Sequence, residues 1–192
     1  MSEQTLHDSA VALLSQWAVP DIATDAIRHT MLAFLAARPD ACLRSCTPGH
    51  LTASTLVLDH TRTHALLTLH PRVGSWIQLG GHCEESDATI AAAAHREAVE
   101  ESGISHLTMS ADPVALHTHP ITCSLGVPTR HLDVRFVAIT DPTLDGSVPP
   151  VVCSDESVDL RWWPVHALPD DDCAPEMDVL VRAALRATEP AG

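Results

Sequence analysis

GGHCEESDATIAAAAHREAVEESGI, which runs from Gly80 to Ile104, is the most informative segment of this chain. It begins with a Gly-Gly turn, continues as an alanine-rich helix and ends in a helical turn that Gly103 closes. At about 100° per residue, three carboxylates of that last turn fall on one face of the helix: Glu97, Glu100 and Glu101. They repel one another and oppose the helix macrodipole, so this patch does not stabilise the helix itself.

The carboxylate patch suits a hard divalent cation. Mg2+ and Mn2+ prefer oxygen ligands, and they keep coordination positions open for water and substrate phosphates. Gly81 ends an apolar, strand-like run, where the missing Cβ lets a backbone carbonyl approach such an ion. Arg96 precedes Glu100 by one turn, which is the less favourable order for a helix-stabilising pair, so its expected role is to orient a ligating carboxylate. The alternative is a solvated acidic helix face.

This segment resembles the Nudix box, a glycine followed by five residues, a glutamate, seven residues and the sequence REUxEExGU, in which U is aliphatic. Gly81 takes the position of the opening glycine, and REAVEESGI matches the second half of the pattern, with Ala98 as a small residue at the aliphatic position. The first half departs from the pattern, because Asp87 stands where the family has glutamate. Eight residues instead of seven then separate Asp87 from Arg96.

The resemblance covers about Leu51 to Leu168 and implies an α/β/α sandwich. It implies a divalent-metal-dependent hydrolase that cleaves the diphosphate linkage of a nucleoside diphosphate derivative, with Mg2+ or Mn2+ as cofactor and a small phosphorylated nucleotide as substrate. The metal ligands would be Gly81, Glu97, Glu100 and Glu101, and the catalytic residues would be Arg96, Glu100, Glu101 and, as general base in an acidic loop, Glu156. A non-catalytic nucleotide sensor and an isopentenyl diphosphate isomerase-like enzyme are the alternatives.

Periodic patterns outside this segment predict strands interleaved with helices. Two apolar stripes predict a pair of helices before residue 49. The further elements are strands at Thr52–Leu58, Ala65–Leu69, Leu132–Ala138 and Val158–Trp162, and a final helix at Glu176–Ala187. This alternation indicates a mixed sheet with helices on its faces. Within the Gly80–Ile104 segment, either Ser86 or Asp87 is expected to cap the helix.

We divide the chain into an added N-terminal helical pair, residues 1–48, and an α/β domain with a C-terminal helix, residues 49–192. The helical pair has three alternative roles: packing, dimerisation and covering of the substrate site. A homodimer is therefore one expectation. A chain of 192 residues with 45% hydrophobic content can bury a full core.

Composition restricts the partners and the compartment. The net charge of -14, from 11 basic and 25 acidic residues, argues against a nucleic-acid polymer as partner. The sequence shows neither a secretory signal peptide nor an apolar run of membrane-spanning length, so we expect a cytoplasmic protein without membrane association. The six cysteines are scattered and are expected to be reduced thiols.

Polar residues outside the glutamate patch are candidates for substrate contacts. The chain contains no lysine, so arginines such as Arg72 and Arg135 are its fixed cations for phosphate groups. His82 lies beside the Gly-Gly turn, and His131 shares the polar face of a predicted strand with Arg135. A less favoured alternative is a zinc site built from His117, His119, His131 and Asp133. Trp76, Trp162 and Trp163 could stack on a base, but core positions are favoured.

Overall fold

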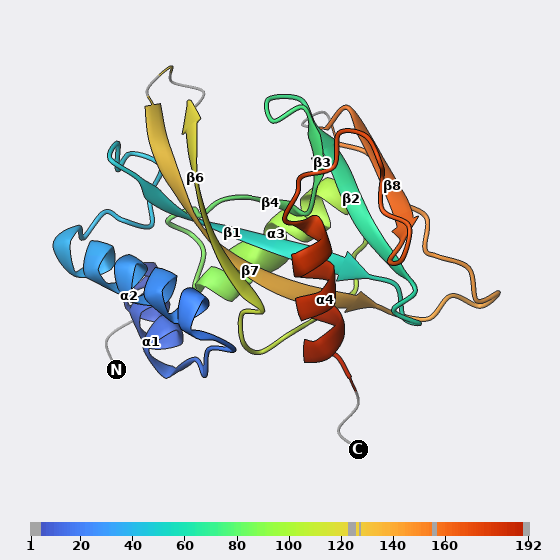
Figure 1. Ribbon diagram of the computed structural model, residues 1–192, viewed down its shortest axis with the longest axis horizontal. Coiled ribbons are helices and arrows are strands. Elements are labelled where there is room, and N and C mark those ends of the chain that lie inside the picture. Colours follow the sequence, from blue (N-terminus) through green and yellow to red (C-terminus); the bar gives the residue numbers. More distant parts are fainter. Residues whose placement is uncertain (1–4, 123–125, 127, 155–156, 190–192) are drawn as a thin grey trace.

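The computed structural model describes residues 5–122, 126, 128–154 and 157–189 (Figure 1). Its elements are α1 (Leu6–Gln16), α2 (Ile22–Ala37), β1 (His50–Leu58), β2 (His64–His70), β3 (Ser75–Ile77), β4 (Leu79–His82), α3 (Ile90–Ser102), β5 (Leu107–Met109), β6 (Ala115–Thr122), β7 (Pro128–Thr140), β8 (Asp159–Pro164) and α4 (Met177–Ala187). The strands form one curled sheet, with α3 on one side and α4 on the other (Figure 1). The predicted α/β/α sandwich with a mixed sheet is therefore confirmed.

β1 lies at the centre of the sheet. It pairs in parallel with β7 along its whole length. Its other edge is shared, because β4 pairs antiparallel with Thr52–Thr55 and β2 pairs antiparallel with Val57 and Leu58. The outer edge of β7 is divided in the same way between β6 and β5. The sheet therefore branches at both edges and curls instead of continuing as a flat layer.

The face of the sheet under α4 is apolar over only half of its length. Leu56 and Leu58 of β1 pack against the apolar side of α4, which presents Met177, Leu180, Val181 and Ala184. Nearer the start of β1, the same face carries Thr52 and Ser54, whose partners on β7 are Asp133 and Arg135. The polar half of this face is available for a cleft.

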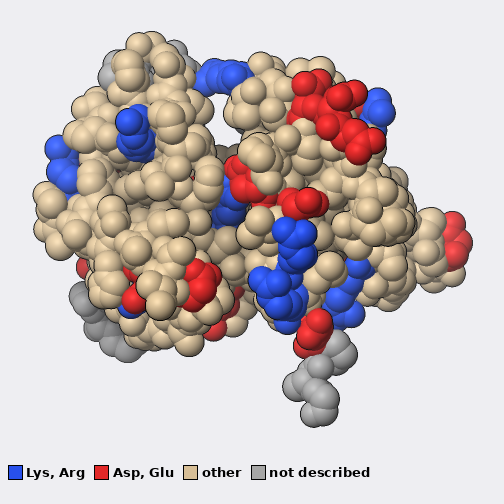
Figure 2. All heavy atoms as spheres, in the orientation of Figure 1, with Lys and Arg blue, Asp and Glu red and all other residues tan. Residues whose placement is uncertain are grey.

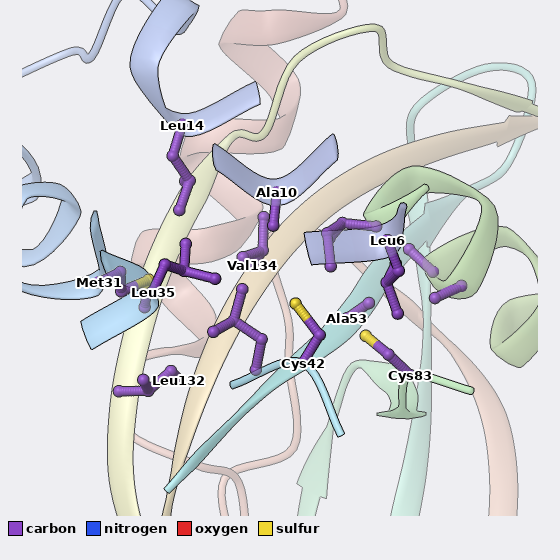
Figure 3. Packing of buried hydrophobic residues seen from close by; sticks show 14 of the residues in the cluster. Leu6, Ala10, Leu14, Met31, Leu35, Cys42, Ala53, Cys83, Leu132 and Val134 are labelled. Carbon is purple, nitrogen blue, oxygen red and sulfur yellow. The ribbon is translucent and has the colours of Figure 1, made fainter. Parts of the chain in front are cut away.

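The opposite face of the sheet packs against α3 and the two N-terminal helices. From α3 it receives Ile90, Ala93 and Ala94, which lie on one arc of the helix. Figure 3 shows the residues that α1, α2, β1 and β7 add to the same cluster: Leu6, Ala10, Leu14, Met31, Leu35, Ala53, Leu132 and Val134. Residues 5–48 thus share a hydrophobic core with the sheet, and the division of the chain at residue 48 stays a prediction.

The start of α3 differs from the expectation. Thr89 caps the helix, because its Oγ1 accepts a hydrogen bond from the backbone N–H of Ala92 at 3.0 Å. Neither Ser86 nor Asp87 holds that position, and the side chain of Asp87 instead pairs with Arg96. The end of the helix is as predicted, since Gly103 adopts a left-handed conformation with φ 71° and donates to the carbonyl of Val99.

Trp76 and two of the described cysteines belong to the core. Trp76 is buried and meets Trp163 edge to face, with ring centroids 5.3 Å apart. Cys42 and Cys83 are buried in the cluster of Figure 3, and the described cysteines form no disulfide. Burial raises the pKa of Cys42 to about 12, so this thiol is neutral near pH 7.

Shortening a buried side chain of α1 should destabilise the whole domain, because α1 belongs to the same core as the sheet. Leu14 is 0% exposed, and we expect Leu14→Ala to lower the free energy of unfolding by about 2–5 kcal/mol. Urea denaturation followed by circular dichroism measures the change. Leu144→Ala, at an exposed loop position, is the matched control and should cost less than about 0.5 kcal/mol. Equal effects of the two substitutions would contradict a shared core.

Candidate active site

The carboxylates of α3 and the polar face of the sheet border two adjoining cavities. The first, of about 540 Å³, is lined by the glutamates of α3 and the loops beside them. The second, of about 410 Å³, lies over the polar half of the sheet, between β6 and the turn that joins β2 to β3. Figure 2 shows the molecule hollowed between β6 and the turn that joins β2 to β3. The cavities share four lining residues, and they therefore form one cleft: Arg44, Gly81, His82 and Glu101.

The structure brings the three predicted glutamates together at the first cavity. Their exposure is graded, since the Glu100 side chain is 59% exposed, that of Glu97 is 12% exposed and Glu101 is 5% exposed. Glu101 is held against β4, because its Oε2 accepts a hydrogen bond from the backbone N–H of Gly80 at 2.9 Å. Three carboxylates with different access to water therefore line the first cavity beside β4, and Glu101 also lines the second.

Arg96 organises this carboxylate cluster. Its Nη1 donates to Glu97 at 3.0 Å and to Glu100 at 3.1 Å. Its Nε and Nη2 donate to the two carboxylate oxygens of Asp87, at 3.1 and 3.0 Å. Nη2 also donates to the carbonyl of His82 on β4. The hydrogen bonds to Asp87 raise the pKa of Arg96, so the guanidinium remains charged and fixes two of the three glutamates.

The two glycines of β4 make this close packing feasible. Gly80 has φ +149°, and a Cβ there would lie 2.5 Å from the Cα of Ser54 and 2.7 Å from the carbonyl oxygen of Ala53. At Gly81 a Cβ would lie 2.6 Å from Oε2 of Glu97. Gly80 therefore lets β4 approach β1, and Gly81 leaves space for the Glu97 carboxylate against the strand.

A buried polar network forms the floor of the second cavity. Asp133 accepts hydrogen bonds from Arg135 Nε at 2.8 Å, from Ser54 and Thr52 hydroxyls at 2.9 and 3.1 Å, and from Gln78 at 3.2 Å. Burial alone would raise the pKa of Asp133, but the charge of Arg135 and these hydrogen bonds outweigh it and lower the pKa. The carboxylate is therefore ionised and fully engaged.

Arg135 lies behind this floor and not in the cleft. It is 4% exposed, and its Nη2 reaches Glu176 at the start of α4, 3.4 Å away. The guanidinium thus joins carboxylates of β7 and α4, and it is not among the residues that line either cavity. Its contact with the substrate stays a prediction. Arg135 does not line the cavities in which the substrate would have to lie.

The predicted contacts His82, His131 and Arg72 do line the second cavity. Arg72 is exposed in the turn between β2 and β3. Burial, together with nearby histidine and arginine charges, lowers the pKa of His82 to about 4. Burial and the neighbouring His82 and His50 lower the pKa of His131 to about 3. Both imidazoles are therefore neutral near pH 7.

The histidine clusters of the structure differ in part from the set that the sequence offered as a zinc site. His117 and His119 do share one side of β6, with their Nδ1 atoms 3.3 Å apart. Asp133, however, is occupied by its own network. In the described part of the chain, the ring of His131 does meet that of His119, with centroids 5.2 Å apart, and it also forms a triangle with His50 and His82. The sequence did not single out His50, because only the pairing of β1 with β7 places it beside His131.

The predicted general base, Glu156, lies outside the described residues. Ser154, two positions before it, lines the first cavity together with the three glutamates. Arg44 is a further cavity residue that the sequence did not single out, and it lines both cavities from the segment after α2. No periodic pattern marks it, because it lies outside the regular elements.

A model of the NUDIX domain family matches residues 49–184. The match covers well over half of the 192 residues, and the chain therefore belongs to the Nudix family, as the Gly80–Ile104 segment predicted. No curated protein matches the chain in sequence.

Solved structures show the same relationship at the level of the fold. A NUDIX family hydrolase from Clostridium perfringens is 25% identical, with a TM-score of 0.53 over 73% of this chain and 98% of that chain. An Ap4A hydrolase from C. elegans, in a binary complex, is 21% identical, with a TM-score of 0.50 over 69% of this chain and 93% of that chain.

A third similar structure is a bifunctional NMN adenylyltransferase/ADP ribose pyrophosphatase from Francisella tularensis, complexed with AMP and Mn ion. It is 20% identical, with a TM-score of 0.50 over 85% of this chain. This chain spans about half of that protein, 47% of its length. At this identity the likeness shows the fold alone.

Family membership makes this chain a Nudix-type hydrolase, an enzyme of the nucleotide pyrophosphohydrolase family.

Among the described residues, no helix is long and apolar enough to cross a membrane.

Alanine at the two glycines of β4 should lower stability by different amounts. Gly80→Ala meets backbone atoms of β1 in an unfavourable region of φ, so we expect a loss of about 3 kcal/mol or more in the free energy of unfolding. Gly81→Ala meets only the end of the Glu97 side chain, which can move, so the loss should stay below about 1.5 kcal/mol. Chemical denaturation of both variants tests this, and a larger loss for Gly81→Ala would contradict the assignment.

Proposed function

We propose that this chain is a divalent-metal-dependent nucleotide pyrophosphohydrolase, which uses Mg2+ or Mn2+ to cleave the diphosphate linkage of a nucleoside diphosphate derivative. The observation that carries the proposal is that Glu97, Glu100 and Glu101 all line the first cavity, and that Glu101 lies where this cavity meets the second. A reacting diphosphate at that junction would have the carboxylates of the first cavity on one side and the second cavity on the other.

The residues at the junction fit a hard divalent ion. Three carboxylates and the backbone beside Gly81 are oxygen donors, and the space next to Glu97 is one that a Cβ at Gly81 would fill. When bound there, the ion would neutralise phosphate oxygens and lower the pKa of an attacking water. Arg96 would hold Glu97 and Glu100 in place for that task through the contacts it already makes.

The second cavity is suited to the nucleoside part of the substrate. Its volume of about 410 Å³ falls within the range of small-molecule sites, about 300–1,000 Å³. Apolar side chains such as Ile77 and Ile121 lie beside the polar groups of Gln78 and His119 in its lining. Arg72 and Arg44 lie at its margin and provide the cationic groups for phosphates.

The proposed base that takes the proton from the attacking water is Glu156. What supports it is position along the chain, since Ser154 lines the first cavity and the acidic segment follows directly. Glu100, the most exposed carboxylate of the cluster, is the alternative base within α3.

The proposed function is tested with a panel of compounds that contain a diphosphate linkage. ADP-ribose, dinucleoside polyphosphates, nucleoside triphosphates, sugar nucleotides and NADH would each be incubated with Mg2+ or Mn2+, and the products identified. We expect ion-dependent cleavage of at least one compound, with loss of activity after chelation and recovery on adding back the ion. Binding without cleavage across the panel would overturn the proposal in favour of a nucleotide sensor.

Removing one carboxylate charge should impair turnover far more than folding. We expect Glu101→Gln to lower kcat by about 100-fold or more, because transition-state charge is stabilised through the carboxylate cluster. The amide can still accept the hydrogen bond from Gly80, so the melting temperature should change little. Glu85→Gln, an exposed neighbour outside both cavities, is the matched control. Near-normal turnover of a folded Glu101→Gln variant would refute the role of the cluster.

Glu156→Gln separates the two candidate bases. If Glu156 accepts the proton, its amide variant should lose about 10²-fold in turnover with little change in affinity for Mg2+. In wild type, turnover should fall at low pH as the base becomes protonated, and this fall should be absent from the pH profile of the variant. A variant that keeps more than about a third of wild-type turnover would exclude Glu156 and direct attention to Glu100.

A further inference from the structure

Three histidines from three neighbouring strands meet on one face of the sheet. His50 begins β1 and pairs directly with His131 of β7, while His82 of β4 pairs with Thr52, two positions along β1. Residues two apart on a strand point to the same side. The three imidazoles form a nearly regular triangle, with ring centroids 5.1, 5.0 and 5.1 Å apart.

One nitrogen of each imidazole is buried without the partner that a buried polar group requires. His50 is 1% exposed. Within the described part of the chain, the Nε2 atoms of His50, His82 and His131 are all buried and have no hydrogen-bond partner. Buried ring nitrogens are normally satisfied. Three unsatisfied nitrogens in one triangle therefore indicate a shared ligand.

The orientation of His50 identifies the nitrogen that is available. Its Nδ1 lies 3.2 Å from the carbonyl oxygen of Cys46, which can only accept a hydrogen bond. Nδ1 must then carry the proton, and Nε2 keeps its lone pair. A backbone carbonyl that fixes the tautomer in this way is the usual companion of a metal-binding histidine.

We propose that His50, His82 and His131 bind a divalent transition-metal ion of the Zn2+ class, at a site separate from the glutamates of α3. One ring nitrogen from each histidine lies within 4.8 Å of the others. Small rotations of the rings would bring them to the spacing of zinc ligands.

The chemistry of the donors separates this site from the one on α3. Imidazole nitrogen favours Zn2+ and related transition ions, whereas carboxylate oxygen favours Mg2+ and Mn2+. Three protein ligands would leave the ion at least one position for water or for an anionic oxygen of a bound molecule. That position would face the second cavity, since His82 and His131 line it. The inference does not rest on the proposed hydrolytic activity.

Zinc binding by the full chain tests the site directly. The metal-free protein would be titrated with Zn2+ by calorimetry, and bound zinc counted after desalting. The parent for comparison is the Glu97→Gln, Glu100→Gln, Glu101→Gln triple variant, which removes the carboxylate site. We expect one tightly bound zinc in wild type and in this parent. His82→Asn or His131→Asn, added to the parent, should weaken zinc binding by at least about 100-fold.

The control and a second measurement keep the test decisive. His106→Asn, at an exposed position away from the cleft, should bind zinc like the parent. If a histidine variant does not fold, the X-ray absorption spectrum of the zinc-loaded triple variant still reports the ligands, and we expect imidazole nitrogen. Unchanged zinc affinity in the folded His82→Asn and His131→Asn variants would overturn the site. So would a ligand shell of sulfur, or of oxygen without imidazole.

Discussion

The parallel pairing of β1 with β7 is the constraint from which the core and the cleft both follow. Its register sets Leu56 beside Val137 on the face that α4 covers, and it sets Thr52 beside Asp133 where no part of α4 contributes to the core. A shift of one residue in either strand would turn every one of these side chains to the other face. The same pairing therefore determines where the domain excludes water and where it leaves a polar cavity.

Charge pairing around two arginines explains how an acidic chain can keep Asp87, Glu97 and Asp133 at low exposure in and beside the cleft. Arg96 contacts Asp87, Glu97 and Glu100, and Arg135 contacts Asp133 and Glu176. Removing one partner from such a pair leaves an uncompensated charge at a site with little water, which costs more than the pair itself contributes. Both arginines are thus committed to holding carboxylates, and Arg44 and Arg72 are the arginines that line the second cavity.

What could be predicted from the sequence depended on local periodicity. The glutamates of α3 lie four residues or fewer apart, so the helical repeat alone placed them on one face. β5 has three residues and is too short for any repeat to show. His50 and Asp133 belong to their clusters because of a strand pairing between residues about 80 positions apart. Asp87 forms its ion pair with Arg96, nine residues later in the chain. Local pattern carries no information on such partners.

β4 places two kinds of potential metal ligand, carboxylate and imidazole, along one cleft. The carboxylates approach Gly80 and Gly81 from α3, whereas His82 directs its ring towards His50 and His131. Because the donors differ in type, a hard ion and a borderline ion would each prefer one of the two sites, even though Glu101, His82 and His131 border the same cavity. With both ions bound, the cleft of this chain of net charge -14 would acquire positive charge on two sides of a phosphorylated substrate, because bound cations are the largest local charges in a site.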